Sequence, residues 1–161
     1  MFNHEPDNFD CPFCEFLKGK ETEYNNQNDI VGQNNLATAF VGPLTWASNP
    51  GSILIITNSH FENFYSTPEE DLKSIFDLAK QVAIAMRSSY DCSGVTILQR
   101  NEPDAGQHVW HLHVHIVPRY KNDGFIENNQ TLFVDAETRL PYAHKIRDFL
   151  YKQSSANDKQ V

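Results

Sequence analysis

Three histidines alternate with apolar residues in the segment Gln107–Arg119, which reads Gln-His-Val-Trp-His-Leu-His-Val-His-Ile-Val-Pro-Arg. Alternate side chains of a β-strand point to the same face, so His111, His113 and His115 are expected to project together, ~6.7 Å apart. The opposite face is then apolar and suited to a core: Trp110, Leu112, Val114 and Ile116. Because imidazole titrates near neutral pH, the pattern predicts a chemically active face. The alternative is an exposed strand with incidental histidines.

This segment resembles the signature of the histidine-triad (HIT) superfamily, which is His-x-His-x-His followed by two apolar residues. The match includes Ala105-Gly106-Gln107 before the histidines and Pro118-Arg119 after them. The resemblance extends from Cys11 to about Tyr120. It implies a small single-domain nucleotide hydrolase or nucleotidyl transferase, commonly a homodimer.

The resemblance also implies roles for the histidines. His113 corresponds to the nucleophile that attacks the α-phosphate of a nucleotide and forms a covalent nucleotidyl-histidine. Water or another acceptor then releases the nucleoside monophosphate. His115 would hydrogen-bond the phosphoryl oxygens, and His111 would orient its neighbours or bind a metal. The backbone N–H near Gly106 can approach a phosphate closely, because glycine has no side chain.

On the phosphate side, the chain departs from the family pattern at two positions. Arg100 stands where relatives carry Asn or Gln, and either Arg100 or the following Asn101 is expected to contact phosphate. His108 stands where relatives often carry Ser or Thr, and it either changes the leaving-group preference or is simply solvated. With Gly106 and Gln107, these residues are the expected nucleotide contacts on this side.

The chain also departs from the family pattern in the region expected to bind the nucleoside. Relatives hold the ribose with an Asp shortly after an Ala-Phe pair, but here Val41-Gly42 follows Ala39-Phe40. We therefore expect weak discrimination between ribose and deoxyribose, unless the lengthened loop to Ser48 supplies another polar group. Three phenylalanines are candidates for packing against the base, with ordinary core residues as the alternative: Phe13, Phe16 and Phe40.

The segment Cys11-Pro12-Phe13-Cys14 is a second candidate site. Some HIT relatives combine such a cysteine pair with two histidines that correspond to His60 and His111. The resemblance thus implies a structural zinc site with four protein ligands. Buried thiols, a redox pair and a histidine that bonds only a loop carbonyl remain the alternatives. No organic cofactor is expected.

Bulk properties limit the function classes. The 161 residues predict one domain at 11–153, with a flexible lead at 1–10 and a disordered tail at 154–161. A net charge of −8 argues against binding to nucleic-acid backbones.

There is no apolar run of ~18 residues and no signal-like N-terminus, so we expect no membrane segment. Three cysteines are an odd number, which favours a reducing cytoplasm.

The remaining patterns predict an α+β fold, in which one long helix packs on a meandering antiparallel sheet. That helix is expected from Thr67 to about Ser88, with Thr67 as its cap, Pro68 in its first turn and Glu70 completing a capping box. A weaker helix is expected from Pro141 to about Lys152. Short apolar runs predict strands at residues 30–31, 37–40, 52–57 and 95–99, and the last of these should pair with the histidine strand.

Two further function classes remain open beside the enzyme. A nucleotide-binding module with a structural zinc would keep the fold and lack turnover, with Arg100 and His108 as the disabling changes. A redox protein would use Cys11 and Cys14, but the preceding strand that a thioredoxin-like motif requires is missing. Retention of all three histidines favours the enzyme.

Overall fold

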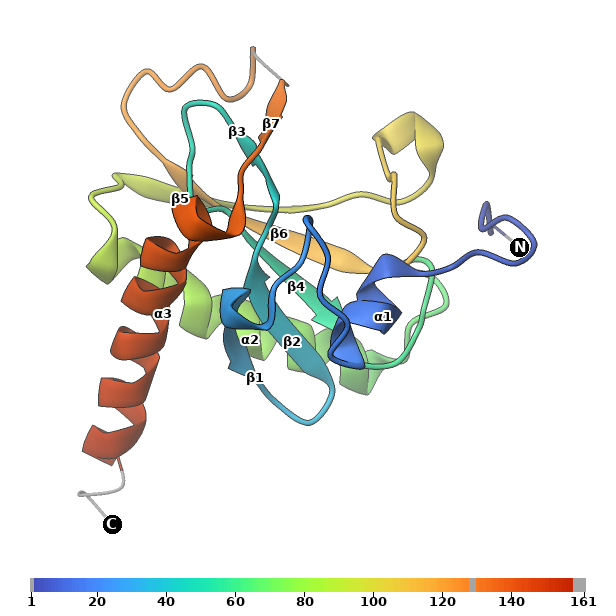
Figure 1. Cartoon of the computed structure of the whole chain (residues 1–161), viewed down its shortest axis with the longest axis horizontal. Coiled ribbons are helices and arrows are strands. Elements are labelled where there is room, and N and C mark those ends of the chain that lie inside the picture. Colours follow the sequence, from blue (N-terminus) through green and yellow to red (C-terminus); the bar gives the residue numbers. More distant parts are fainter. Residues whose placement is uncertain (1, 128–129, 158–161) are drawn as a thin grey trace.

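The computed structural model describes residues 2–127 and 130–157, and its main element is a five-stranded antiparallel sheet (Figure 1). The strands lie in the order β1-β2-β4-β6-β5, so β6 lies between β4 and β5. The α+β fold predicted from the sequence is confirmed, as is the antiparallel pairing of β5 with β6. The strand bounds are β1 Ile30–Gln33, β2 Ala37–Val41, β4 Ile53–Thr57, β5 Gly94–Gln99 and β6 His113–Arg119.

Two long helices cover one face of this sheet. In Figure 1, α2 (Glu69–Ser89) runs behind the sheet and α3 (Ala136–Asn157) runs along its side. The apolar stripe of α2 meets alternate residues of the two central strands, and burial of these side chains is the main source of stability. This core includes Ile75, Leu78, Val82 and Met86 of α2, Ile53 and Ile55 of β4, and Val114 and Ile116 of β6.

The other face of the sheet carries the short helix α1 (Pro12–Leu17) and a second apolar cluster. Directly opposed residues of an antiparallel pair share a face, and His113 is opposed to Ile56 while His115 is opposed to Leu54. The two histidines therefore lie on the α1 face, among the residues of the second cluster. Its buried members are Cys11, Phe13, Phe16, Phe40, Leu54 and Ile56.

A small second sheet, which the sequence analysis did not predict, lies beyond the main one. It pairs β3 (Leu44–Trp46) with β7 (Thr131–Phe133) in antiparallel register, with Leu44 opposite Phe133 and Trp46 opposite Thr131. Figure 1 shows this pair rising from the end of the main sheet. The lengthened loop after β2 therefore contains ordered β-structure.

The start of α2 differs from the sequence prediction. Pro68 occupies the N-cap position, and no side chain caps the helix. The Thr67 hydroxyl instead donates to the Asn63 carbonyl at 2.8 Å. The predicted capping box with Glu70 is therefore wrong, because Thr67 is one residue too early and its hydroxyl is already bonded.

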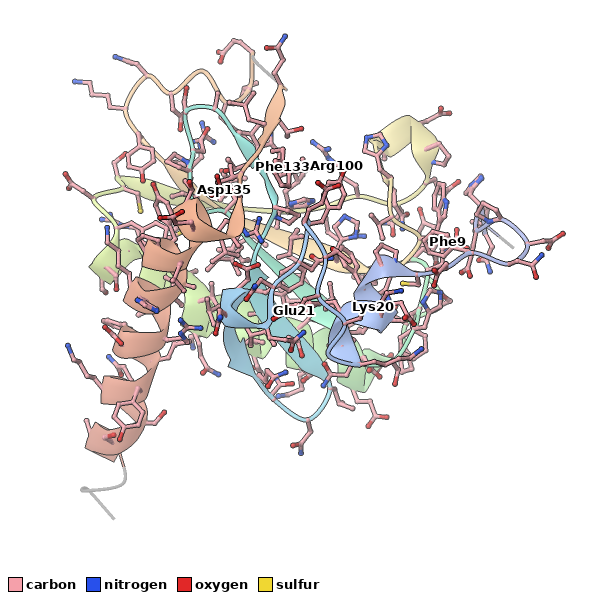
Figure 2. The ribbon with its side chains drawn as sticks, viewed as in Figure 1. Phe9, Lys20, Glu21, Arg100, Phe133 and Asp135 are labelled. Atoms are coloured by element: carbon pink, nitrogen blue, oxygen red, sulfur yellow. The ribbon has the colours of Figure 1, made fainter. Side chains whose placement is uncertain are left out.

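The start of α3 also differs, because the helix begins before Pro141. The Asp135 carboxylate, labelled at the top of α3 in Figure 2, accepts from the Thr138 backbone N–H at 2.8 Å and caps the helix. Pro141 lies inside the helix. A proline in the interior removes one hydrogen bond, so its position suggested a helix start, but the packing of α3 against α2 and β1 outweighs that loss.

Both chain ends carry more structure than the sequence analysis expected. In the lead, the backbone N–H groups of His4 and Glu5 donate to the buried Glu62 carboxylate at 2.5 and 3.2 Å. At the other end, α3 includes residues 154–157 of the predicted tail, and residues 158–161 lie outside the described part. Among the described residues, no helix is long and apolar enough to cross a membrane.

A buried ion pair ties α3 to the start of β1. The Arg139 guanidinium donates from Nε and Nη2 to the two carboxylate oxygens of Asp29, at 3.0 and 2.7 Å. Both residues are only 1% exposed. Asp29 ends the 3₁₀ turn Gln27–Asp29, which directly precedes β1.

We expect Asp29→Ala to lower the free energy of unfolding by about 3–5 kcal/mol, because it leaves the Arg139 charge buried and unpaired. Urea unfolding followed by circular dichroism measures the change. Lys73→Ala, which breaks the exposed pair between Lys73 and Asp77, is the control and should have little effect. Equal effects of the two substitutions would contradict the assigned importance of the buried pair.

Candidate active site and metal cluster

The three histidines divide into two groups. His113 and His115 lie on β6 with ring centroids 5.1 Å apart. His111 precedes the strand and lies against His60, with ring centroids 5.0 Å apart. The predicted single strand therefore holds only His113 and His115, while His111 lies before it, although Phe13 of α1 contacts the rings of both His111 and His113. The chain leaves the sheet before β6, where the Leu112 backbone N–H donates to the Phe61 carbonyl at 2.6 Å.

The apolar side of this segment follows the prediction with one exception. Leu112, Val114 and Ile116 are buried in the main core. Trp110 is only half-buried, and its ring packs beside that of His4, with centroids 5.9 Å apart. Trp110 lies outside the core because it belongs to the loop before the strand.

His113 has a defined hydrogen-bonding state. Its Nδ1 lies 2.8 Å from the His111 carbonyl oxygen, and because a carbonyl only accepts, Nδ1 carries the hydrogen. In the neutral ring Nε2 then keeps its lone pair. Burial lowers the pKa of His113, and the nearby Arg100 and His108 charges lower it further. Burial likewise holds the pKa of His115 well below its usual value. Both rings are therefore neutral at pH 7.

A cavity of about 1090 Å³ opens over His113 and His115. One part of its wall comes from the loop between β5 and β6, and another from α1 and the loop after it. Figure 2 shows this separation, with Arg100 in the upper part of the molecule and Lys20 beside α1. The cavity is large enough for a nucleotide-sized ligand. Its lining also includes Phe13, Asn25, Leu44, Trp46, Leu54, Asp104, Gly106 and His108.

Four of the predicted nucleotide contacts line this cavity: Phe13, Arg100, Gly106 and His108. Gly106 has φ +86°, a left-handed conformation that favours glycine, and an added Cβ would lie 3.4 Å from Arg100 Nη1. The predicted close approach of the Gly106 backbone to a ligand is thus compatible with the structure.

Four other predicted contacts do not line the cavity. Phe16 and Phe40 are fully buried, with ring centroids 4.7 Å apart, and they form the layer beneath Phe13. The Asn101 side chain accepts from the Phe64 backbone N–H at 2.8 Å. Gln107 is buried and donates from Nε2 to the Glu62 carbonyl at 2.7 Å, while its Oε1 accepts from the Glu102 N–H. These residues hold the walls of the cavity in place.

The metal-ligand prediction brings four side chains together. The ligand atoms of Cys11, Cys14, His60 and His111 all lie within 4.8 Å of one another. Cys11 Sγ lies 3.3 Å from His111 Nδ1, and Cys14 Sγ lies 3.3 Å from His60 Nδ1. Burial raises the pKa of the Cys11 thiol to about 12 and lowers that of His111 to about 4. His111 does not line the cavity, so its place is in this cluster.

The outer nitrogens of both histidines have acceptors. His111 Nε2 lies 2.9 Å from the Thr57 carbonyl oxygen, and His60 Nε2 lies 2.9 Å from a Glu5 carboxylate oxygen. Each Nε2 therefore carries a hydrogen, and each Nδ1 presents a lone pair to the cysteines. This is the usual arrangement of metal-binding histidines.

Two buried polar residues in the cavity lining were not expected from the sequence. They are Trp46 and Asn25, and among the described residues neither the Trp46 Nε1–H nor the Asn25 Oδ1 has a hydrogen-bond partner. Asp10, Glu15 and Glu23 also line the cavity, so it contains carboxylates although the Asp that relatives carry after the Ala-Phe pair is absent. The only sequence signal for this part of the cavity lining was the lengthened loop after Gly42. The pairing of β3 with β7 joins segments that lie far apart in the sequence, so a local pattern does not reveal it.

Comparison with known proteins agrees with this geometry. A family model described as the HIT domain matches residues 23–122, which include β1 through β6. An uncharacterized HIT-like protein of Mycoplasma genitalium is 34% identical over 111 residues, covering 69% of this chain and 74% of that protein. This chain belongs to the HIT family. The matched HIT domain contains the three histidines and His60, whereas Cys11 and Cys14 precede it.

Solved HIT structures share the fold. A zinc-bound histidine triad family protein from Mycobacterium smegmatis superposes with a TM-score of 0.73 at 22% identity, covering 91% of this chain and 97% of that one. The diadenosine triphosphate hydrolase of Plasmodium falciparum, in complex with cyclomarin A, gives 0.68 at 21% identity, covering 86% and 92%. The HIT sheet and its helices are therefore common to proteins of very different sequence.

Proposed function

We propose that this HIT protein hydrolyses nucleotide conjugates, or transfers their nucleotidyl group, through a covalent intermediate on His113. The observation that carries the proposal is the His113 ring itself. Its Nδ1 hydrogen is bonded to the His111 carbonyl, and this leaves the Nε2 lone pair available beside His115 at a nucleotide-sized cavity. A neutral imidazole of this kind is a competent nucleophile at pH 7.

In the first step, His113 Nε2 attacks the α-phosphorus, and the bond from phosphorus to the leaving group breaks. The leaving group departs with the bonding electron pair and takes a proton, which His108 would supply because it lines the cavity and is exposed. His115 and Arg100 would bind the non-bridging oxygens, where negative charge develops. In the second step, water attacks phosphorus and gives a proton to His108, which lost one in the first step. The P–N bond breaks, its electron pair returns to His113 Nε2, and a nucleoside monophosphate is released.

The relatives support this class of substrate. The Plasmodium falciparum neighbour is a diadenosine triphosphate hydrolase, so the fold accommodates hydrolysis of nucleotide conjugates. Phosphoramidates, adenylylated molecules and dinucleoside polyphosphates are the candidate substrates. The net charge of −8 does not oppose a nucleotide ligand, because Arg100 and Lys20 supply local positive charge at the cavity.

We also propose that the Cys11, Cys14, His60 and His111 cluster holds a structural zinc ion. Tetrahedral zinc with Zn–S ~2.3 Å and Zn–N ~2.0 Å places sulfur and nitrogen ligands ~3.5 Å apart. The Sγ–Nδ1 separations of 3.3 to 3.6 Å match this spacing. Four protein ligands leave no position for water, so the ion would stabilise the fold rather than act on substrate. Because the ligands must be reduced thiols, we propose a cytoplasmic protein.

A homodimer is the proposed assembly. Phe76 and Ile84 are exposed on α2, and Phe64 and Tyr65 are exposed on the loop before it, although Phe61 is half-buried. β5 lies at the edge of the sheet. Exposed apolar side chains and a strand at the edge of the sheet are both suited to contact with a second copy.

The nucleophile assignment predicts that His113→Ala lowers turnover by ~10³-fold or more, because the covalent step is lost. Release of nucleoside monophosphate from a panel of adenosine nucleotide conjugates measures this, and thermal unfolding checks that the variant is folded. Full activity of His113→Ala would show that another group attacks phosphorus. Saturable nucleotide binding by the wild type without any release would indicate the non-catalytic binding module.

The zinc assignment predicts that protein purified without added metal contains about one zinc per chain, since all four ligands come from the chain. Cys14→Ser should lose the metal and unfold at a lower temperature. Cys92→Ser is the matched control, because Cys92 is buried away from the cluster and should keep the zinc. Elemental analysis decides the question, and a stable metal-free wild type would contradict the assignment.

The dimer assignment predicts that light scattering at micromolar concentration gives about twice the mass of one chain, as expected for a symmetric pair. Ile84→Asp should shift the mass toward that of a single chain, because it places a charge in the apolar contact. A single-chain mass for the wild type would exclude the dimer.

A further inference from the structure

The two histidines among the four candidate metal ligands differ in what holds their outer nitrogens. These ligands are called the Cys/His cluster below and are Cys11, Cys14, His60 and His111. The His111 ring is fully buried, and its Nε2 lies 2.9 Å from the carbonyl oxygen of Thr57, the last residue of β4. The exposed His60 has its Nε2 2.9 Å from a carboxylate oxygen of Glu5. The outer nitrogen of His60 is therefore bonded to a side chain of the N-terminal lead, and that of His111 to the backbone of the sheet.

The backbone of Glu5 is fixed beside His60 by a buried carboxylate. Glu62 is only 4% exposed, and its two carboxylate oxygens accept from the backbone N–H groups of His4 and Glu5, at 2.5 and 3.2 Å. A buried carboxylate needs such donors, because its burial without them is costly. His60 and Glu62 are two residues apart, so the same short segment carries the candidate ligand and anchors the backbone of its partner.

The lead has further contacts that do not involve the Glu5 side chain. The Asn63 Nδ2 donates to the Phe2 carbonyl at 3.1 Å, and the His4 ring lies 3.2 Å from a Glu102 carboxylate oxygen. The His4 ring also packs beside Trp110. We therefore expect the lead to stay in place when the Glu5 carboxylate is removed. Among the described residues, that carboxylate bonds His60 alone.

The bond from Glu5 determines what His60 can offer to a metal ion. An ionised carboxylate only accepts, so the His60 Nε2 carries the hydrogen and the Nδ1 lone pair faces Cys14 Sγ, 3.3 Å away. An exposed imidazole without such a partner can rotate and can carry its hydrogen on either nitrogen. A carboxylate behind a histidine ligand fixes the ring and its tautomer, and it strengthens the other nitrogen as a donor of electrons to the metal.

We propose that Glu5 is a positioning residue of the Cys/His cluster, whose carboxylate orients His60 and strengthens the binding of zinc. This inference rests on the proposed structural zinc. It assigns a role to the N-terminal lead, which lies outside the matched HIT domain at residues 23–122. The lead would therefore contribute to the metal site although it supplies no ligand itself.

The test measures the dissociation constant for zinc in competition with a chromophoric chelator at neutral pH. Glu5→Ala should weaken zinc binding by about tenfold or more, the usual effect of removing such a partner. Glu5→Gln should give an intermediate affinity, because its amide oxygen still accepts the hydrogen bond but carries no charge. Glu5 is exposed, so both variants should fold, and circular dichroism checks this.

His4→Ala is the matched control within the lead. It keeps the backbone N–H that bonds Glu62 and removes only a side chain that contacts Glu102 and Trp110. Its affinity for zinc should equal that of the wild type. A second measurement separates positioning from simple stabilisation of the fold. Glu5→Ala should lower the unfolding temperature of the zinc-bound wild type more than that of Cys14→Ser, which is expected to lack the metal.

Equal zinc affinities of the wild type and a folded Glu5→Ala protein overturn the inference and leave the zinc site intact. The same loss in His4→Ala as in Glu5→Ala also overturns it, because docking of the lead would then be the cause. A Glu5→Gln protein that binds as weakly as Glu5→Ala assigns the effect to charge alone and rejects the positioning role. Equal drops in unfolding temperature with and without the metal likewise reject it. A wild type that binds no zinc refutes the proposed zinc site itself.

Discussion

The antiparallel pairing of β4 with β6 is the interaction on which both candidate sites depend. It places His113 opposite Ile56 and His115 opposite Leu54, so the histidines face α1 while Val114 and Ile116 enter the core. The last residue of β4, Thr57, then accepts the His111 Nε2 hydrogen at 2.9 Å. One strand pair thus orients the two rings at the cavity and the third ring in the cluster of Cys11, Cys14, His60 and His111.

The Cys/His cluster and the cavity are structurally joined. His111 offers its side chain to the cysteines and its backbone carbonyl to His113 Nδ1. The proposed zinc would therefore hold the carbonyl that sets the hydrogen position on the neighbouring histidine. Glu5 adds a further link, because it bonds His60 at 2.9 Å and connects the N-terminal lead to the cluster. This connection explains why a chain segment with no regular structure lies against the domain.

The cavity combines an apolar wall with a few polar groups. Phe13, Leu54 and Leu44 supply apolar surface, while Arg100 and the two histidines supply the groups suited to phosphate. The wall carrying Trp46 belongs to the small β3–β7 sheet, and its support comes from the bonds around Asp123. The pKa of Asp123 lies well below its usual range, mainly because of its hydrogen bonds with Arg119. The hydrogen bonds among Arg119, Asp123 and Asn49, whose backbone N–H bonds the Trp46 carbonyl, thus support Trp46 in the lining of the cavity.

The sequence alone determined the strands of the main sheet, the long helix and the two histidines at the cavity, because these depend on local periodicity and on a short motif. Spacing along one segment identified His113 and His115, and the family resemblance identified all four members of the metal cluster. Only the tertiary structure decided that His111 leaves the strand, since this depends on Leu112 bonding the distant Phe61 carbonyl. Burial of Phe16 and Phe40, and the wall formed by β3 with β7, likewise arise from contacts between distant segments. Local patterns cannot encode such contacts, because their free energy is realised only when the segments meet.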